Sequence, residues 1–351
     1  HLGIRMPSIW YEVHLHTKSD DSSEDEDALH VGGYSFVGAP GVIVGHNREI
    51  SWGVTNVDPD VQDLFIERIN PEDPTEYRVN GTWREMDLRS ETIRIAGRHE
   101  PKEIVVRETR HGPIVTDLTG NEPHRGFGIQ EPRLSSDAMQ LRALALQWTA
   151  LEPNTTMTAV YRLNRAKNFG EFRNAVRRFD VPGQNFVYAD DEGNIGYQAS
   201  GKVPIRRNGS GRLPVPGWND RYAWTGYVPF DELPFSYNPE KDYVVTANNP
   251  VTEPEYPHHI ADHFDYGYRA RRIDELIRTH EGPISRRDVA RMHGDLYARS
   301  ASEILPVVLR DAVFSRARSR IFEEERDAAS TAEQRAAISP EQLETARETL
   351  S

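Results

Sequence analysis

Apolar and polar residues alternate in short runs along the chain up to about residue 250. Such alternation is typical of half-buried strands, because successive side chains of a strand point to opposite faces of a sheet. It predicts strands at 34–37, 41–44, 91–95 and 103–106. Two turns have the composition of hairpin loops, Asn80-Gly81 and the segment 191–194. This part of the chain is therefore predicted to be rich in strands joined by tight turns.

The period of the apolar residues becomes helical in two places. Over 155–179 one helical face would carry Met157, Val160, Leu163, Phe169, Phe172 and Val176. From Arg269 onward the pattern is helical almost throughout. We therefore expect a β-rich core at 1–268 and a helical region at 269–351. The acidic segment 18–27 is predicted to be a loop too polar to pack into a core. The Glu-, Ala- and Arg-rich end beyond Phe322 has weak apolar periodicity and is predicted to be a peripheral helix.

Composition excludes several classes of site. The 351 residues include no cysteine, which rules out disulfides, thiolate catalysis and zinc–thiolate sites. No apolar run approaches the ~20 residues that a membrane span requires. The net charge of -13 argues against a nucleic-acid partner, whose phosphates attract basic surfaces. The acidic surface suits either an ordinary solvated protein or a halophilic one, in which salt screens the self-repulsion.

Two familiar catalytic patterns are weak in this chain. His258, His259 and His263 invite a zinc hypothesis, but no His-Glu-x-x-His pattern occurs and Pro257 favours a loop. Segment 208–212 lacks the Gly-x-Ser-x-Gly pattern of a serine hydrolase elbow and is predicted to be a turn.

A series of segments, in order along the chain, resembles the β-chain of the penicillin acylase family, a branch of the N-terminal nucleophile hydrolases. The segments are 1–3, 7–12, 40–47, 50–68, 111–115, 182–190, 193–197, 213–217, 246–249 and 268–273. The resemblance implies an α+β fold in four αββα layers, of which this chain would form a part. It also implies hydrolysis of a linear amide in a small-molecule substrate, a separate α-chain as partner, and a periplasmic or extracellular location.

The resemblance further implies a nucleophile that the chain does not contain. The family uses a serine whose own α-amine, with a pKa of ~8, serves as the base. Autocatalytic cleavage of a zymogen would expose that serine, which we expect upstream of His1. The chain is then expected to be an internal fragment that is inactive alone. A different class stays open, in which the chain is a non-catalytic, calcium-stabilised binding module.

The resemblance assigns the oxyanion hole to two asparagines. The side chain of Asn248 and the main-chain N–H of Asn56 would donate to the tetrahedral intermediate. Arg269 would orient Asn248, with Arg271 and Arg272 as neighbouring candidates for the same role. If the resemblance does not hold, the pair Asn248-Asn249 is simply a turn.

Further positions are implied for the nucleophile and the acyl group. His1 would hydrogen-bond the amine of the nucleophile, and Leu2, Trp148 and Phe186 are expected to contact the acyl chain. A histidine at the first position favours an N-acyl-homoserine lactone or cephalosporin acylase over a penicillin acylase. Activity on β-lactams would place the enzyme in an antibiotic biosynthetic process.

The acidic turn at 58–63, between two apolar runs, suits a hard cation, because carboxylates and carbonyls are its preferred ligands. The resemblance implies a structural calcium held by the carboxylates of Asp60, Asp63 and Asp262 and by the main-chain carbonyls of Gln62 and Gly211, with a further ligand from the α-chain. The alternative is an acidic turn that binds no ion, as expected in so acidic a chain.

Overall fold

The computed structural model describes residues 6–17, 28–116 and 142–308. The chain divides into two compact units, His1–Ala270 and Arg271–Ser351. In the part of the chain that is described, no helix combines the length and apolar character needed to cross a membrane.

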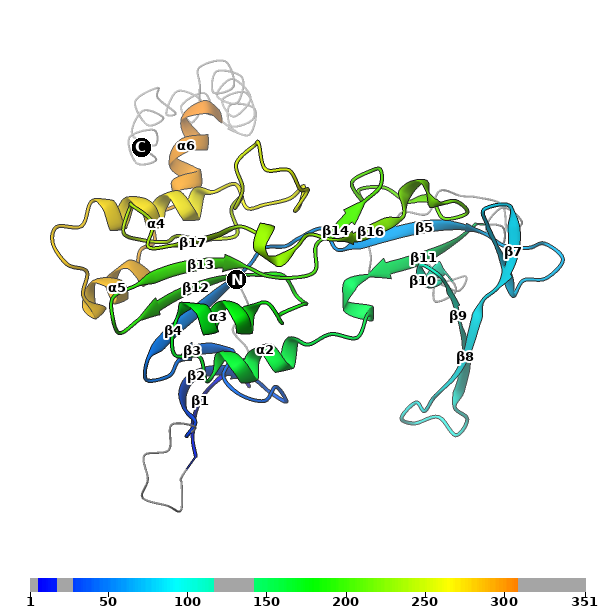
Figure 1. The fold of residues 1–351 in the computed structure, drawn as a ribbon, viewed down its shortest axis with the longest axis horizontal. Coiled ribbons are helices and arrows are strands. Elements are labelled where there is room, and N and C mark those ends of the chain that lie inside the picture. The colour runs from blue at the N-terminus through cyan, green and yellow to red at the C-terminus, as the bar shows by residue number, and fades with distance from the viewer. Residues whose placement is uncertain (1–5, 18–27, 117–141, 309–351) are drawn as a thin grey trace, which may run out of the picture. The chain divides into compact units, whose positions relative to one another are not determined.

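A seven-stranded antiparallel sheet forms the centre of the first unit (Figure 1). Its strands, in spatial order, are β1 (Trp10–His16), β2 (His30–Phe36), β3 (Val44–His46), β4 (Ile50–Asn56), β12 (Gln184–Asp190), β13 (Ile195–Ala199) and β17 (Phe235–Tyr237). The central neighbours β4 and β12 are far apart in sequence, yet seven residue pairs join them, from Asn56 opposite Gln184 to Ile50 opposite Asp190.

Two helices, α2 (Thr156–Leu163) and α3 (Phe169–Val176), cover one face of this sheet (Figure 1). Their apolar stripes meet alternate strand residues, so that Phe172 of α3 packs against Phe186 and Tyr188 of β12. The helical segment 155–179 was predicted, but it contains a break. Asn164 exchanges hydrogen bonds with both the N–H and the C=O of Val42, which lie far away in sequence. Asn168 then accepts from the N–H of Glu171 and starts a new helix.

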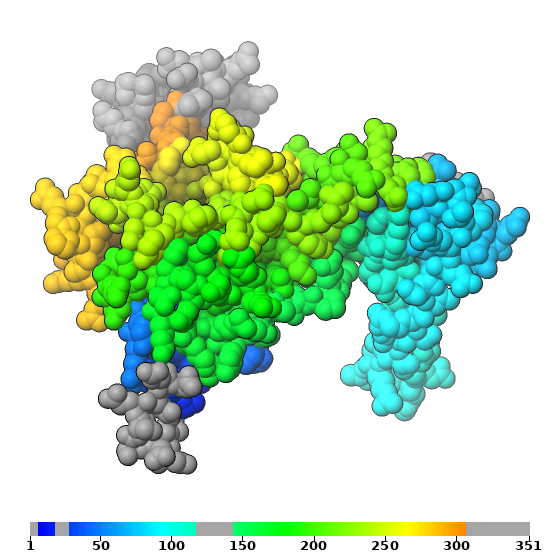
Figure 2. Space-filling model, viewed as in Figure 1, coloured from blue at the N-terminus to red at the C-terminus, as the bar shows by residue number. Residues whose placement is uncertain are grey.

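Smaller sheets extend the first unit beyond β4 and β12. They comprise β5 (Gln62–Arg68) with β11 (Arg142–Trp148) and β15 (Val215–Pro216), β8 (Asp87–Ile93) with β9 (Lys102–Thr109) and β10 (Gly112–Pro113), β6 (Glu76–Val79) with β7 (Thr82–Glu85), and β14 (Pro204–Arg206) with β16 (Trp224–Tyr227). The β8–β9 hairpin projects as an arm from its neighbours (Figures 1 and 2). Among the described strands, only β15 pairs in parallel, with β5.

The helical pattern predicted from Arg269 onward is present up to residue 308, and residues 309–351 lie outside the described part of the chain. The helices are α4 (Tyr268–Arg278), α5 (Arg286–His293) and α6 (Arg299–Val308). Within the second unit, Arg272 bonds both carboxylate oxygens of Asp295 at 2.9 Å. A capping box between Ser285 and Asp288 starts α5.

Most of the predicted strands and turns are present. Segments 34–37, 91–95 and 103–106 fall largely within β2, β8 and β9, and both hairpin turns join the strands expected. Segment 41–44 is the exception, because only Val44 belongs to a strand. Gly41 has a φ of 83°, and the Asn164 contact holds Val42 in a loop. The acidic segment 18–27 and the end beyond Phe322 lie outside the described residues.

Candidate active site

The two asparagines predicted for the oxyanion hole lie in contact, although 192 residues separate them. The Nδ2 of Asn248 donates to the main-chain oxygen of Asn56 over 2.9 Å. Beside this bond, the hydroxyls of Thr246 and Thr55 lie 2.8 Å apart. Asn248 has a φ of 64°, in the left-handed region that asparagine tolerates better than most residues. The segment 246–248 is thus held against Thr55 and Asn56, the last two residues of β4.

Arg269 determines how the amide of Asn248 is oriented. Its Nη2 lies 2.9 Å from the Oδ1 of Asn248, 2.9 Å from the carbonyl of Ala247 and 3.0 Å from the carboxylate of Asp265. Because a guanidinium can only donate, the Asn248 oxygen must face it and the amide nitrogen must face Asn56. The neighbouring candidates point elsewhere, since Arg271 bonds Glu303 and Arg272 bonds Asp295. Arg269 is therefore the arginine that contacts Asn248.

The peptide N–H of Asn56 faces away from β12. The N–H of Val57 donates to the carbonyl of Gly183 over 3.2 Å, which makes these two a hydrogen-bonded pair. The adjacent pair, Asn56 opposite Gln184, is then non-hydrogen-bonded, and its N–H and C=O groups point away from the partner strand. On that outer side, β3 pairs only with earlier residues of β4. The Asn56 N–H is therefore directed toward the side that β3 leaves uncovered.

A buried polar network holds the end of β4. Asn185 is fully buried and its Nδ2 donates to the Asn56 carbonyl at 3.0 Å and to the Thr55 hydroxyl at 3.1 Å. The hydroxyl of Tyr197 donates to the Oδ1 of Asn185 over 2.6 Å, and burial raises the pKa of Tyr197, which keeps it a donor. Gln184 adds a bond to the Oδ1 of Asn56 at 2.8 Å. Asn185 thus holds the carbonyl of Asn56 directly, while Tyr197 holds Asn185 and Gln184 holds the side chain of Asn56.

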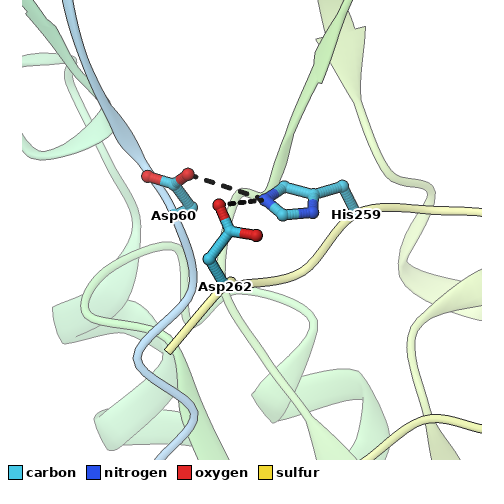
Figure 3. A group of neighbouring side chains, drawn as sticks. All are labelled: Asp60, His259 and Asp262. Carbon is cyan, nitrogen blue, oxygen red and sulfur yellow. Dashed lines mark ion pairs between the residues drawn. The ribbon is translucent and has the colours of Figure 1, made fainter. Parts of the chain in front are cut away.

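The five predicted cation ligands are only partly brought together. Asp60 and Asp262 lie near one another, and the Nε2 of His259 lies 3.6 Å from Asp60 and 3.9 Å from Asp262 (Figure 3). Burial raises the pKa of Asp60, while Arg206 opposes that shift. Asp63, by contrast, is 3% exposed and bonds Arg206 and Trp224.

Each of the other predicted positions has a different place. Gly211 lies beside Asp63, and Gln62, whose main-chain carbonyl was the predicted ligand, begins β5 opposite Trp148 of β11. Phe186 is 1% exposed between the sheet and the helices, because strand alternation turns it away from the face that carries Asn185. It is a core residue here, in contrast to the predicted acyl contact. Trp148 is half-buried at the end of β11, and His1 and Leu2 lie outside the described residues.

Sequence reasoning missed Asn185 and Arg206. A signal for Asn185 existed, since a polar residue inside a largely apolar strand must find hydrogen bonds when buried. For Arg206 the chain offers no local signal, because its partner Asp63 is 143 residues away.

Known proteins share this arrangement of strands and helices. A solved thermostable penicillin G acylase from Alcaligenes faecalis, in an orthorhombic form, matches with a TM-score of 0.68 and 24% identity, over 87% of this chain and 51% of that chain. This likeness confirms the predicted fold class, that of the N-terminal nucleophile hydrolases.

Sequence relatives point the same way. Acyl-homoserine lactone acylase QuiP of Pseudomonas aeruginosa is 32% identical over 277 residues, or 79% of this chain and 31% of that protein. Penicillin G acylase of Escherichia coli is 33% identical over 260 residues, or 72% of this chain and 28% of that protein. The chain thus spans about a third of the length of the curated relatives that it matches. A family model described as penicillin amidase matches residues 1–345, and the chain belongs to the penicillin amidase family.

Proposed function

We propose that the protein from which this chain comes is an acylase that hydrolyses a linear amide and releases the acyl group. The observation that carries the proposal is the contact of Asn248 with the main chain of Asn56, oriented by Arg269. An oxyanion hole needs two fixed donors aimed at one oxygen, and this arrangement supplies an amide side chain and a peptide N–H on neighbouring groups.

The two N–H groups of the Asn248 side chain support its role as an oxyanion donor. An asparagine amide has two N–H groups, and Asn248 uses one of them on the Asn56 carbonyl. Among the described residues the second N–H has no protein partner, so a substrate oxygen can take it. The positive charge of Arg269 lies on the far side of the amide. It polarises the group toward a developing negative charge.

The nucleophile and the partner chain complete the proposal. An N-terminal serine outside this chain would attack the carbonyl, with its own α-amine as base and His1 beside it. A separate α-chain would help to line the acyl pocket. The chain by itself supplies oxyanion donors without an attacking group, and we expect it to be inactive alone.

For the substrate we propose the N-acyl-homoserine lactones, with cephalosporin side chains as the second candidate. The name of the Pseudomonas relatives supports the first, but an Escherichia coli penicillin G acylase is equally similar in sequence. A panel of aliphatic acyl-homoserine lactones, a glutaryl amide and a phenylacetyl amide, assayed with the full-length protein, separates the three classes. Preference for the phenylacetyl amide would overturn the choice of lactones.

Replacing Asn248 tests the oxyanion assignment. In the full-length protein, Asn248→Ala is expected to lower kcat by about 10²- to 10³-fold, because one oxyanion donor is lost. The melting temperature should fall by no more than a few degrees, because Asn248 is only half-buried and alanine is moderately strained at a φ of 64°. Asn154→Ala is the matched control, an exposed asparagine that bonds only local main chain.

Two results would contradict the proposal. Unchanged turnover in Asn248→Ala would remove this residue from the site. Absence of amide hydrolysis in a correctly processed full-length protein would favour the alternative, a non-catalytic binding module.

A further inference from the structure

The centre of the predicted cation site is a buried carboxylate that already has a counterion. The side chain of Asp63 is 3% exposed and that of Arg206 is 4% exposed. The Nε of Arg206 lies 2.8 Å from Oδ2 of Asp63, and its Nη2 lies 2.8 Å from Oδ1. Such a bidentate pair matches a planar guanidinium to both oxygens of one carboxylate. The indole N–H of Trp224 donates to Oδ2 as well, over 2.6 Å.

Other predicted cation ligands surround the same guanidinium. The main-chain oxygen of Asp60 accepts from Nη2 of Arg206 over 2.9 Å, and its carboxylate lies 3.7 Å away. Gly211 has a φ of 82°, and a Cβ there would lie 2.4 Å from Oδ1 of Asp63 and 2.8 Å from Nη2 of Arg206. Three of the five expected ligands, Asp60, Asp63 and Gly211, thus enclose an arginine head group.

The donor set therefore does not fit the expected calcium. Calcium takes 6–8 oxygen ligands at about 2.3–2.6 Å, and it would need the lone pairs that Asp63 gives to Arg206 and Trp224. A guanidinium within hydrogen-bond distance of the same oxygens would also repel a divalent ion. The remaining carboxylate, that of Asp262, lies 2.9 Å from the guanidinium of Arg212.

We propose that in this protein the guanidinium of Arg206 takes the place of a bound cation. It ties β5, which carries Asp63, to β14, which it ends, and to the main chain at Asp60. Arginine carries its positive charge throughout the pH range in which proteins fold, so the cross-link needs no bound metal. Asp60 follows Asn56 by a few residues, and the cross-link therefore also anchors the connection that leads out of β4.

The test compares chelation with substitution in the full-length protein. Metal analysis of protein purified without added calcium is expected to find less than one calcium per molecule. The melting temperature should be the same, within about 1 °C, with calcium chloride and with the chelator EGTA, because a ligand that binds the folded state raises it with concentration. Arg206→Ala should lower the melting temperature by about 10 °C, since it leaves a buried carboxylate unpaired.

A matched control and a milder variant complete the design. Arg207→Ala removes the neighbouring arginine, which is exposed and donates to the carbonyl of Asp220. It should shift the melting temperature by about 2 °C or less. If Arg206→Ala does not fold, Arg206→Lys is measured instead. It keeps the charge but loses the bidentate geometry, and should melt between the other two proteins.

Three results would overturn the proposal. They are a stoichiometric calcium that survives purification, a melting temperature that falls by several degrees in EGTA, and an Arg206 variant that melts like Arg207→Ala. None of these readouts depends on catalysis, so the test stands apart from that of the proposed acylase activity.

Discussion

Two arginines in the first unit hold polar partners in opposite ways. The side chain of Arg206 is 4% exposed, and two of its nitrogens donate to the buried carboxylate of Asp63. The side chain of Arg269 is 39% exposed and places one nitrogen among three oxygen atoms, one of them on Asn248. A buried charge that loses its partner is strongly destabilising, whereas an exposed one is rehydrated by water. Burial therefore predicts that Arg206 governs stability and that Arg269 governs the geometry of the site.

The largest effect is expected on stability, from breaking the buried pair of Arg206 and Asp63. Asp63→Asn removes the charge opposite Arg206 and should reduce the free energy of unfolding by about 3 kcal/mol, because it leaves a buried guanidinium without a counterion. Urea denaturation of the full-length protein measures it. Asp220→Asn serves as the control, since that carboxylate pairs with Arg110 at an exposed position and should matter much less. Equal losses in both variants would show that burial does not separate the two kinds of pair.

A smaller effect, on turnover and not on stability, is expected from changing the exposed Arg269. Arg269→Lys should lower kcat by about 10-fold with little change in KM, because an ammonium cannot hold Asn248 in the same orientation as the guanidinium. Melting should stay close to that of the natural protein. Steady-state kinetics with the preferred amide measure the split, and Arg271→Lys is the control. If Arg269→Lys lowered the melting temperature and left turnover intact, Arg269 would serve stability and not the geometry of the site.

The smallest effect concerns Asp60, which lies beside Arg206. Burial raises the pKa of Asp60, so the folded state binds this proton more tightly than the unfolded state. The resulting stabilisation is present below about pH 3.9 and is lost as the pH rises through the raised pKa. Asp60→Asn should therefore flatten the melting temperature against pH in that range and change it by no more than about 2 °C at neutral pH. A large loss at neutral pH would indicate a metal ligand.

How much could be predicted from sequence depends on how local the cause is. The Asn80-Gly81 hairpin was predicted correctly, because both residues adopt positive φ angles that their own chemistry favours. The break between α2 and α3 was not, because it depends on Asn164 bonding Val42 across 122 residues. Gly41-Val42 fails as a strand for the same reason.

The residues of the candidate site also differ in whether the sequence could reveal them. Asn56, Asn248 and Arg269 were found through family resemblance, and the structure brings all three together. Their catalytic roles stay predictions. Arg206 and Asn185 could not be placed in this way, because their importance comes from partners that only the folded chain supplies. Carboxylate spacing suggested a metal, yet it cannot reveal that an arginine from a distant strand reaches the same oxygens.

The pairing of β4 with β12 also delays the assembly of the central sheet while the chain is being synthesised. Asn56 and Gln184 are 128 residues apart, and a ribosome that adds about 5–20 residues per second needs about 6–25 s to make that stretch. During this interval β4 has no neighbour on its β12 side, and unpaired strand edges are templates for aggregation. The central sheet therefore cannot close until residues 184–190 have been made, and until then β4 presents an unpaired edge to other nascent chains.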